Sequence, residues 1–559
     1  MLAVAVFVLC GLPLVAQDNN TVIQHATRFS VSPPLRDLAK LPQSPRYGLH
    51  EANPVRRVPK HPVGPVVDTV EQSSAPASGV NYSIGLNFLG VGHGFPNYTV
   101  PDAPPDTNMA VGDTQVVQWV NTSYTVCSKT TGTCGASIEG NTLWSSLGGI
   151  CATNNDGDII AQWDVVAHRW LLTQNVFTGS YGVCVAISTT NDATGTYYLY
   201  EFPVLASGFP DYPKWGNWPP NQWAETWNNF GPGGSGFKGP VLCIYDRQKL
   251  LAGDKSAEQI CHQYTSGEDS LLPADQDSVT QPPVGEAQFA IGSVGDVDNS
   301  HLSLYSAKVN DPSNWGSGAT FTGDGNSQLL AVATYNPSCN GAYGGDCVPQ
   351  KGISDLDDSL GDRLMYRFAY WEDQPVANVG AQPPKPVPAQ HWFVNFDVTA
   401  SGGNIGPRWM EITAPIKVVT PSALGIFQQG TYAPDGNWRW MGSLTRDKVG
   451  DILLGYSVSC GSTCPGGTSG GVYPSVYIAG RQVNDPLGLG MLEAEEVVAA
   501  GSGSQPDTSS RWGDYSSMRI DTNDGHNGCT FWYTTEFYEV TQTFDWSTQI
   551  ASAQFSNCN

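Results

Sequence analysis

Acidic side chains recur at one position of a loose repeat in this sequence, and their spacing predicts a shared site. Each repeat has a Gly- or Asp-containing turn, an apolar strand, a tight turn and a strand holding Trp or Tyr. Intervals of roughly 50 to 80 residues suit four-stranded propeller blades. If each acid precedes the innermost strand of its blade, the carboxyl groups gather at one mouth of the central channel. They belong to Asp106, Asp158, Asp211, Glu286, Asp362, Asp435 and Asp514.

Carboxyl groups held close together could act as general acid and base. Like charges raise one another's pKa, which keeps one group protonated near neutral pH. The sequence therefore predicts catalytic roles for Asp158, Asp362 and Asp514. An alternative stays open for each of them, because an Asp at a strand entrance also caps turn amides and recurs when the turn recurs.

Three repeats also place an arginine near the acid, in "GDRLMYR", "NWRWMGS" and "RWGDYSS". These residues are Arg363, Arg439 and Arg511. A guanidinium group matches a carboxylate with two parallel hydrogen bonds, so three of them converging would bind an acidic sugar. The adjacent Trp440 and Trp512 could stack on sugar rings. Alternatively, each arginine pairs with its neighbouring Asp and braces adjacent blades.

The last repeat offers a second kind of chemistry. Tyr515 and Glu536 could form a tyrosine nucleophile with its carboxylate base.

Clustered side-chain oxygens in three loops suit a structural calcium ion, because hard cations prefer such ligands. The candidate ligands are Asp156 and Asp158, or Asp355, Asp357 and Asp358. No segment matches a complete EF-hand, and the nine histidines are scattered singly, which leaves a zinc hydrolase unsupported. We expect no required cofactor.

Composition indicates the scaffold that must position these groups. The 559 residues are 40% hydrophobic and 14% charged, with 62 Gly, 40 Pro and 17 Trp, which favours strands and turns over helices. The net charge of -24 argues against nucleic acid and anionic lipid as partners, since both need clustered Lys or Arg.

The repeats predict an all-β chain folded as a β-propeller of seven blades, with six as an alternative. In "CTFWYTTEF" both alternating faces are partly apolar, as expected for a sheet packed between two neighbours. A large β-sandwich with appended modules is the competing architecture.

Three segments are expected along the chain. Residues 1–16 resemble a signal peptide, residues 17–103 form a Pro-rich arm or pro-segment, and residues 104–559 form the propeller. Removing the first segment leaves twelve cysteines, enough for six disulfides, and three local pairs are Cys127/Cys134, Cys339/Cys347 and Cys460/Cys464. We expect a secreted monomer, extracellular or periplasmic, without a membrane span.

The motifs "PPDTNMAVG", "NNDGD", "DSLGDRLMYR", "TYAPDGNWRWMGS" and "RWGDYSSM" resemble those of exported bacterial proteins of unassigned function, from about residue 25 to the C-terminus. More distantly, the chain resembles sialidase-type propellers. That resemblance implies an arginine triad, a Tyr/Glu nucleophile pair and an Asp acid, for which the residues named above are the matching positions. No S-x-D-x-G-x-x-W Asp box occurs, which departs from the sialidase pattern.

Two functions follow from these patterns. The first is a glycoside hydrolase acting on an extracellular glycan, with an acidic sugar as substrate. The second is a non-catalytic propeller that binds carbohydrate or serves at a surface.

Overall fold

The computed structural model describes residues 20–41, 50–51, 56, 64–75, 79–205, 208–265, 268–293, 299–323, 328–341, 345–361, 363–373, 389–491 and 493–559. The expected signal peptide and Asp362 lie outside these residues. Strands dominate the described part of the chain, and its helices are short.

Consecutive strands pair as antiparallel units that follow one another along the chain. Unit 1 contains β7 (Thr107–Val111), β8 (Gln115–Val120), β9 (Ser123–Ser128) and β10 (Ile138–Glu139). Unit 2 contains β11 (Ile159–Asp164), β12 (Arg169–Val176), β13 (Gly182–Ser188) and β14 (Tyr197–Pro203). Unit 3 contains β15 (Phe209–Trp218), β16 (Gln222–Gly231), β17 (Ser235–Asp246) and β18 (Glu258–Gln263).

The next two units pair with each other through their first strands. Unit 4 contains β19 (Asp269–Gln276), β20 (Gln288–Ser293), β21 (His301–Val309), β22 (Ala319–Thr322) and β23 (Leu329–Ala331). Unit 5 contains β27 (Leu364–Glu372), β28 (Ala389–Thr399), β29 (Ile405–Pro415), β30 (Gly425–Tyr432) and β24 (Asn336–Pro337). The parallel pair β19–β27 joins them into one sheet.

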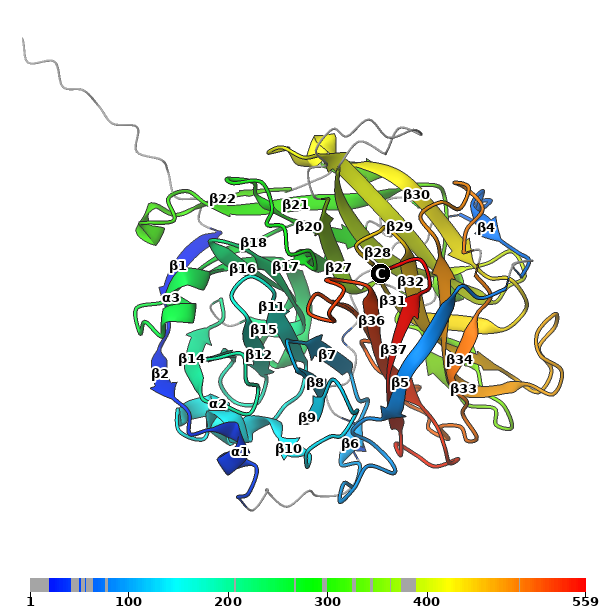
Figure 1. Cartoon of the computed structure of the whole chain (residues 1–559), viewed down its shortest axis with the longest axis horizontal. Coiled ribbons are helices and arrows are strands. Elements are labelled where there is room, and N and C mark those ends of the chain that lie inside the picture. Colours follow the sequence, from blue (N-terminus) through cyan, green and yellow to red (C-terminus); the bar gives the residue numbers. More distant parts are fainter. Residues whose placement is uncertain are drawn as a thin grey trace, which may run out of the picture.

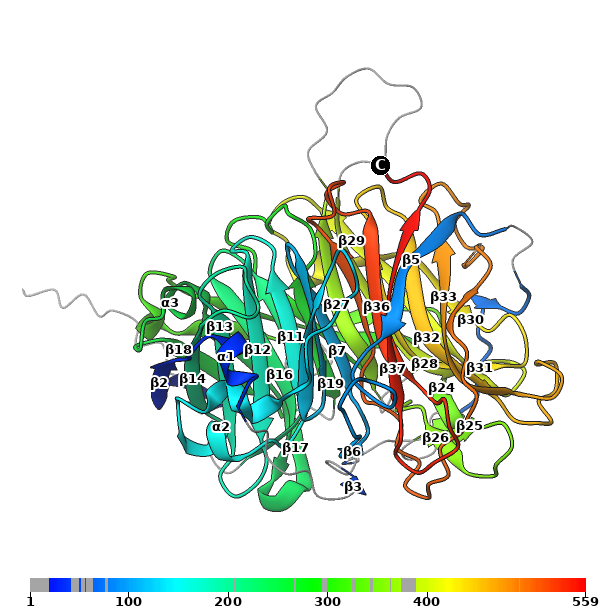
Figure 2. The ribbon, with the colours of Figure 1, turned by 60° about the horizontal axis from the view of Figure 1, so that its bottom comes forward.

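The last two units complete the series. Unit 6 contains β31 (Trp438–Arg446), β32 (Ile452–Cys460), β33 (Val472–Arg481) and β34 (Glu496–Ala499). Unit 7 contains β35 (Ser517–Asp521), β36 (Thr530–Phe537), β37 (Ser547–Phe555) and β5 (Tyr82–Leu89). In Figures 1 and 2, β5 lies beside β37, although the two are far apart in sequence.

Short elements connect the units. The helices are α1 (Leu35–Leu38), α2 (Gly149–Thr153), α3 (Arg247–Ala252), and the 3-10 turns η1 (Gly140–Trp144), η2 (Pro232–Gly234), η3 (Trp315–Ser317), η4 (Ser338–Gly341) and η5 (Pro421–Ala423). A parallel bridge joins β3 (His50–Glu51) to β6 (Asp102–Ala103), and β25 (Asp346–Pro349) pairs with β26 (Leu356–Asp358).

The first strands of the seven units contact one another in a closed ring, in the order β7, β11, β15, β19, β27, β31, β35 and back to β7. Further strands of each unit pair outward from this ring. The fold is therefore a β-propeller, and we count each unit as one blade.

Both faces of the strands are buried, as expected when each sheet packs between two neighbours. Every residue of β11, β13 and β16 is buried. One apolar cluster joins Leu444 and Ile478 of unit 6 to Phe531 and Tyr533 of unit 7, so the core lies between the sheets.

The N-terminal segment is part of the sheets. The strands β1 (Thr21–His25), β2 (Arg28–Val31) and β4 (Glu71–Gln72) extend the outer edges of units 3, 2 and 5. The strand β5 is the outermost strand of unit 7, so N-terminal and C-terminal strands close the ring together. Sheet pairing thus continues across residue 104, where the sequence predicted that the propeller would begin.

Six disulfides link Cys127–Cys134, Cys151–Cys184, Cys243–Cys261, Cys339–Cys347, Cys460–Cys464 and Cys529–Cys558. The three local pairs predicted from the sequence are confirmed. None of the helices in the described ranges is long and apolar enough to cross a membrane.

Candidate functional site

The entrances of four first strands bring carboxyl groups together at one end of the ring. Asp106 and Asp158 directly precede β7 and β11, Asp211 lies near the start of β15, and Asp514 precedes β35. The Asp514 N–H donates to Asp106 Oδ1 at 2.8 Å, and their mutual charge interactions extend to Asp158 and Asp211. We call the surrounding group the mouth cluster: Asp106, Asp158, Asp211, Tyr212, Lys214, Arg363, Arg511, Asp514 and Tyr515.

The backbone at the mouth adopts an uncommon conformation. Three residues have a positive φ, with values of 45° at Asp106, 48° at Asp158 and 58° at Tyr212. A residue with a bulky side chain rarely adopts this region, and such strain concentrates at functional sites. A β-bulge between Asp211 and Lys214 lets both side chains belong to the cluster.

Cations occupy the same end of the ring. Arg511 Nη1 lies 2.8 Å from Asp514 Oδ1. The Arg363 guanidinium lies 4.8 Å from the centre of the Tyr212 ring. Lys214 Nζ lies 3.1 Å from the same ring centre and 3.8 Å from that of Tyr515. Two of the three predicted arginines, Arg363 and Arg511, are thus at the mouth.

A further arginine comes from the N-terminal segment. Arg56 Nη1 lies 3.5 Å from Asp211 Oδ1, and its guanidinium lies 3.7 Å above the Phe209 ring. Arg363 Nη2 donates to the Arg56 carbonyl at 3.5 Å. Arg56 therefore covers Asp211, a contact that the sequence did not predict because residues 17–103 were expected to form a Pro-rich arm or pro-segment.

Burial raises the pKa values of two acids at the mouth and lowers that of the lysine. Burial, together with Asp158, raises the pKa of Asp211 to about 7, although Arg56 and Arg363 oppose the change. Burial, with Asp514 and Asp158, raises the pKa of Asp106 well above its usual range. Burial lowers the pKa of Lys214 well below its usual range, against the pull of Asp158. Carboxyl groups with shifted pKa values in one cluster are candidates for acid and base catalysis.

The third predicted arginine does not join the cluster through any contact in the described residues. Arg439 binds Asp435 and Glu495, each at 2.7 Å. Arg439 thus pairs with its neighbouring Asp, as in the alternative left open by the sequence, but both partners lie in unit 6 and not in an adjacent blade.

The two predicted sugar-stacking tryptophans are core residues. Trp440 and Trp512 are fully buried, with ring centres 5.2 Å apart, and Trp512 Nε1 donates to Ser457 Oγ at 3.3 Å. Neither indole reaches the surface, so both rings pack in the core and do not face a ligand in this structure.

Tyr515 and Glu536 do not form the predicted pair. The Tyr515 hydroxyl has no hydrogen-bond partner among the described residues, and burial and the mouth carboxylates raise its pKa well above its usual range. Glu536 Oε1 instead accepts from the Gly513 N–H, and burial raises its pKa to about 8. The Tyr515 hydroxyl group is therefore harder to deprotonate than a solvent-exposed tyrosine.

Two predicted members of the acid ring lie elsewhere. Glu286 precedes β20, a second strand, and accepts from the Val419 N–H at 3.0 Å. Asp435 accepts from the Asn437 N–H at 2.8 Å as well as binding Arg439. In unit 4, the acid at the bulge that matches Asp211 is Asp269.

The predicted calcium ligands act as hydrogen-bond acceptors. Asp156 Oδ2 accepts from the backbone N–H groups of Phe177 and Thr178 at 2.8 and 2.9 Å. Asp358 Oδ1 accepts from the Leu360 N–H at 2.7 Å, and burial raises the pKa of Asp357 well above its usual range. The described residues contain no group of three or more His, Cys, Asp or Glu side chains that could hold a metal ion. Asp158 and Asp355, the other two candidate calcium ligands, therefore belong to no such group.

A second charged cluster fills the ring farther along the first strands. Arg367 binds Asp275 at 2.8 Å and Asp277 at 2.6 Å, and Arg519 binds Asp275 at 2.7 Å. Thr445 Oγ1 donates to Asp277 at 2.5 Å. We call these residues the ring ion-pair cluster. It ties together β19, β27, β31 and β35.

The raised pKa values of three buried acids predict that the free energy of unfolding decreases as pH rises. Burial raises the pKa values of Glu225, Asp397 and Glu536 to about 8. The folded state therefore holds these protons more tightly than the unfolded state, whose carboxyl pKa values are about 4. Their stabilising contribution is complete below about pH 4 and is lost as pH rises towards about 8.

Denaturant unfolding at a series of pH values checks this expectation. The free energy of unfolding should decrease between about pH 5 and pH 8, and Asp397→Asn should make the decrease shallower. The Asn side chain stays neutral and can still accept from the Met441 N–H, which lies 3.0 Å from Asp397 Oδ2. Stability that rises across this range, or an unchanged slope in the variant, would contradict the assignment.

The fold and the mouth cluster define this chain as a β-propeller with a buried acid and arginine site. No family model and no curated protein matches it. Among solved structures, it is similar to the phage phi92 endosialidase (8% identity, TM-score 0.35, covering 86% of this chain and 70% of that one). It is also similar to the Penicillium chrysogenum alpha-L-arabinanase complexed with arabinobiose (12% identity, TM-score 0.29, covering 64% and 96%).

A third similar structure is the subtype N11 neuraminidase-like protein of A/flat-faced bat/Peru/033/2010 (7% identity, TM-score 0.30, covering 70% of this chain and 92% of that one). The low TM-scores leave the fold assignment resting on the strand pairing described above.

Proposed function

We propose that this protein is an exported glycoside hydrolase that cleaves an extracellular glycan containing an acidic sugar at the mouth cluster. The observation that carries the proposal is the pair of neighbouring carboxyl groups Asp158 and Asp211. Burial, followed by the charge of Asp158, raises the pKa of Asp211 to about 7, so Asp211 can hold a proton near neutral pH. Glycoside hydrolysis uses such a pair, one group protonated and the other ionised.

In the proposed reaction, Asp211 gives its proton to the glycosidic oxygen as the bond from that oxygen to the sugar carbon breaks. Water adds to the carbon, and its proton passes to Asp158, whose Oδ2 accepts from the Tyr212 N–H at 3.1 Å. The Tyr212 N–H orients this carboxylate beside Asp211. Proton exchange with solvent then restores both groups.

The charge balance supports an acidic sugar as ligand. When Asp106 and Asp211 are protonated, the guanidinium groups of Arg363, Arg511 and Arg56 outnumber the remaining carboxyl groups of the cluster. Asp514 engages Arg511, and Arg363 and Arg56 are the further cations of the cluster that would attract a carboxylate. A guanidinium group in a buried site binds a carboxylate strongly.

Arg56 also limits access to the proposed acid. Asp211 is 7% exposed and lies under Arg56. Substrate therefore reaches Asp211 when the Arg56 side chain moves from it to the substrate carboxylate. Export is supported by six disulfides, which persist in oxidising compartments.

Binding of acidic oligosaccharides tests the choice of ligand. Arg363→Ala should weaken binding of a uronic- or sialic-acid oligosaccharide by about tenfold or more, because a buried charge-assisted contact is lost. Arg36→Ala is the matched control, since Arg36 forms an exposed ion pair with Asp192 far from the mouth. Equal affinity in wild type and Arg363→Ala would refute the assignment of Arg363.

A binding propeller without catalysis is the second candidate. The ring ion-pair cluster fills the centre, and Asp106, Asp158, Asp211 and Asp514 are at most 8% exposed. A filled ring with buried acids favours recognition over turnover. Acidic oligosaccharides that bind at the mouth without being cleaved would support this function.

A further inference from the structure

Aspartates recur where the first strands end, on the side of the ring opposite the mouth cluster. The strands β7, β11 and β35 begin at the mouth cluster, so their other ends lie on the far side of the ring. In six units an Asp is the last residue of the first strand or follows it within two residues. These residues are Asp113, Asp164, Asp277, Asp373, Asp447 and Asp521, in units 1, 2, 4, 5, 6 and 7.

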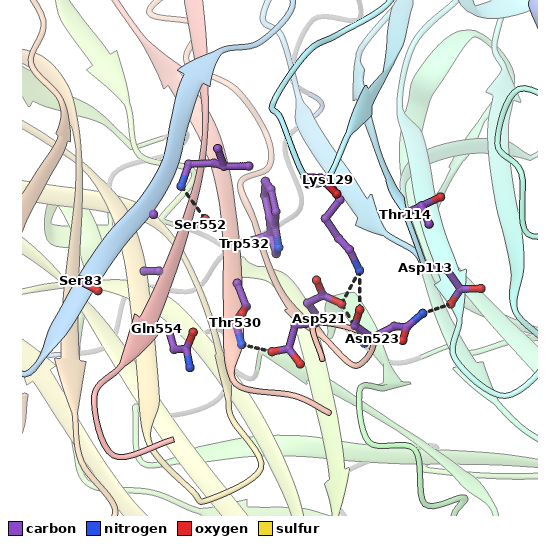
Figure 3. Close-up of a pocket in the computed structure, with 15 residues that line it drawn as sticks. Ser83, Asp113, Thr114, Lys129, Asp521, Asn523, Thr530, Trp532, Ser552 and Gln554 are labelled. Atoms are coloured by element: carbon purple, nitrogen blue, oxygen red, sulfur yellow. Dashed lines mark hydrogen bonds and ion pairs between the residues drawn. The ribbon is translucent and has the colours of Figure 1, made fainter. Parts of the chain in front are cut away.

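Five of these acids are paired with a basic side chain. Asp521 Oδ1 lies 2.9 Å from Lys129 Nζ, and Figure 3 shows this lysine pointing towards Asp521. Asp164 lies 2.6 Å from Arg247. The other pairs are Asp113 with His168, Asp277 with Arg367 and Asp373 with Arg446. Buried carboxylates need such partners, because a charged group loses its hydration when it is buried.

Asp447 of unit 6 is the exception. The residue is 0% exposed, and its Oδ1 accepts from the backbone N–H groups of Val449, Gly450 and Asp451, each at 2.9 Å. Its Oδ2 is buried without a hydrogen-bond partner among the described residues. No basic side chain in that part of the chain forms an ion pair with it, unlike the acids of the other five units.

The two basic residues that flank Asp447 in the sequence are engaged elsewhere. Arg446 binds Asp373 at 3.2 Å, and its Nε donates to the backbone carbonyl of Asp447 at 3.0 Å. Lys448 Nζ donates to two backbone carbonyl groups of the C-terminal part of the chain. The Asp447 carboxylate therefore keeps a free oxygen and no close cation.

A second buried acid shares the same turn. Asp451 is also 0% exposed, and its Oδ1 accepts from the Val483 N–H at 2.7 Å, whereas its Oδ2 is buried without a partner in the described residues. Burial, followed by the Asp451 charge, raises the pKa of Asp447 to about 7, although the Arg446 charge opposes the change. Two buried carboxylates repel each other unless a proton or a cation compensates their charge.

We infer that a calcium ion binds the carboxylates of Asp447 and Asp451, beneath the turn of residues 448–450. A divalent cation neutralises both carboxylates and takes their free Oδ2 atoms as ligands. Hard cations such as calcium prefer oxygen ligands, whereas zinc favours nitrogen and sulfur. The site does not depend on hydrolysis at the mouth cluster.

Oxygen atoms other than carboxylates complete the ligand set. Calcium takes about six to eight oxygen atoms, which include amide, carbonyl and water oxygens. The exposed Asn557 side chain lies beside Asp451 and opposes the effect of burial on its pKa, and turning the amide over presents its oxygen to the ion. Residues 448–450 are half-buried, so water reaches the edge of the site. Magnesium demands a near-ideal octahedral shell and keeps several waters, which suits a buried pair less well.

Calorimetric titration of the EDTA-treated full-length protein with calcium chloride tests the inference. Wild type should bind calcium, and the bound ion should raise its melting temperature. Asp451→Asn should weaken calcium binding by about 100-fold or more, because removing a ligand costs more than removing a group that supports one, which costs about 10- to 100-fold. Asn can still accept from the Val483 N–H, so the turn should keep its fold.

Melting temperatures without calcium separate a metal ligand from a merely structural acid. In EDTA, Asp451→Asn should melt at or above the wild-type temperature, because the change removes one of two repelling charges. Asp113→Asn is the matched control, since it makes the same change at the equivalent place in unit 1, where the acid pairs with His168. This control should bind calcium with wild-type affinity.

Four results would overturn the inference. The first is that wild type binds no calcium, in which case the two carboxyl groups share a proton instead. The second is that Asp451→Asn binds calcium as tightly as wild type and Asp113→Asn, which would place the ion at another site. The third is that wild type binds magnesium as tightly as calcium, which would contradict the choice of ion. The fourth is that Asp451→Asn melts below wild type in EDTA, which would show that no repulsion between the two acids calls for a cation.

Discussion

Replacing Asp211 by Asn should lower glycan hydrolysis by about 10²- to 10⁴-fold, the usual contribution of a general acid. Asn keeps the neutral form that Asp211 has below pH about 7 but has no proton to donate. The variant should therefore fold as wild type does and still bind acidic oligosaccharide. Steady-state assay of released reducing ends, with binding measured in parallel, checks this separation of turnover from affinity.

The pH profile provides a further check on the same residue. The acid must be protonated, so wild-type turnover should decline as pH rises through about 7. Asp192→Asn is the control, because Asp192 forms a half-exposed ion pair with Arg36 away from the mouth. Turnover in Asp211→Asn equal to that of the control would show that the proposed acid is wrong.

Replacing Arg367 by Met should lower the free energy of unfolding by about 3 to 5 kcal/mol, the usual cost of breaking a buried ion pair. Arg367 is 1% exposed and neutralises Asp275 and Asp277, which are themselves buried. Met fills similar space but leaves these two carboxyl groups without their cation. Because the ring ion-pair cluster joins four units, the loss should destabilise the whole ring in denaturant unfolding.

Arg36→Met provides the matched control for charge removal. The Arg36 and Asp192 side chains are 55% and 40% exposed, so losing this pair should cost about 0 to 1 kcal/mol. Similar losses of stability in Arg36→Met and Arg367→Met would mean that the ring ion-pair cluster does not hold the units together.

The sequence predicted the architecture because the physical cause of the repeat is local. A turn acid followed by an apolar strand marks each first strand, and Asp106, Asp158, Asp211 and Asp514 do gather at one end of the ring. The prediction failed at Glu286, which precedes β20 and not a first strand. Asp435 does precede a first strand, β31, by three residues, but it binds Arg439 within unit 6.

The side-chain partners were harder to predict than the strands. Arg439 lies near an acid in the sequence just as Arg511 does, yet Glu495, far along the chain, holds it within unit 6. Arg56 reaches Asp211 from a segment with no strand pattern. Lys214 could have been suspected as a site residue from the sequence alone. It is the one basic residue in the aromatic run "DYPKWGNW", in a chain with few charged residues. Only tertiary packing decides such contacts.

The ring ion-pair cluster was also invisible in the sequence. Arg367 and Arg519 alternate with apolar residues in their strands, so the sequence pattern predicts that their side chains face solvent. Their carboxylate partners lie in unit 4: Asp277 and Asp275 are 90 and 92 residues from Arg367, and Asp275 is 244 residues from Arg519. No local rule relates residues so far apart.

Hydrolysis of acidic polysaccharides by the wild-type protein, compared with Asp211→Asn, tests the central claim most directly. The account predicts that wild type releases reducing ends from a glycan containing uronic or sialic acid, faster below pH about 7 than above it. It also predicts that the variant binds the same glycan and releases almost none. Binding by both proteins with no release by either would contradict catalysis at the mouth cluster.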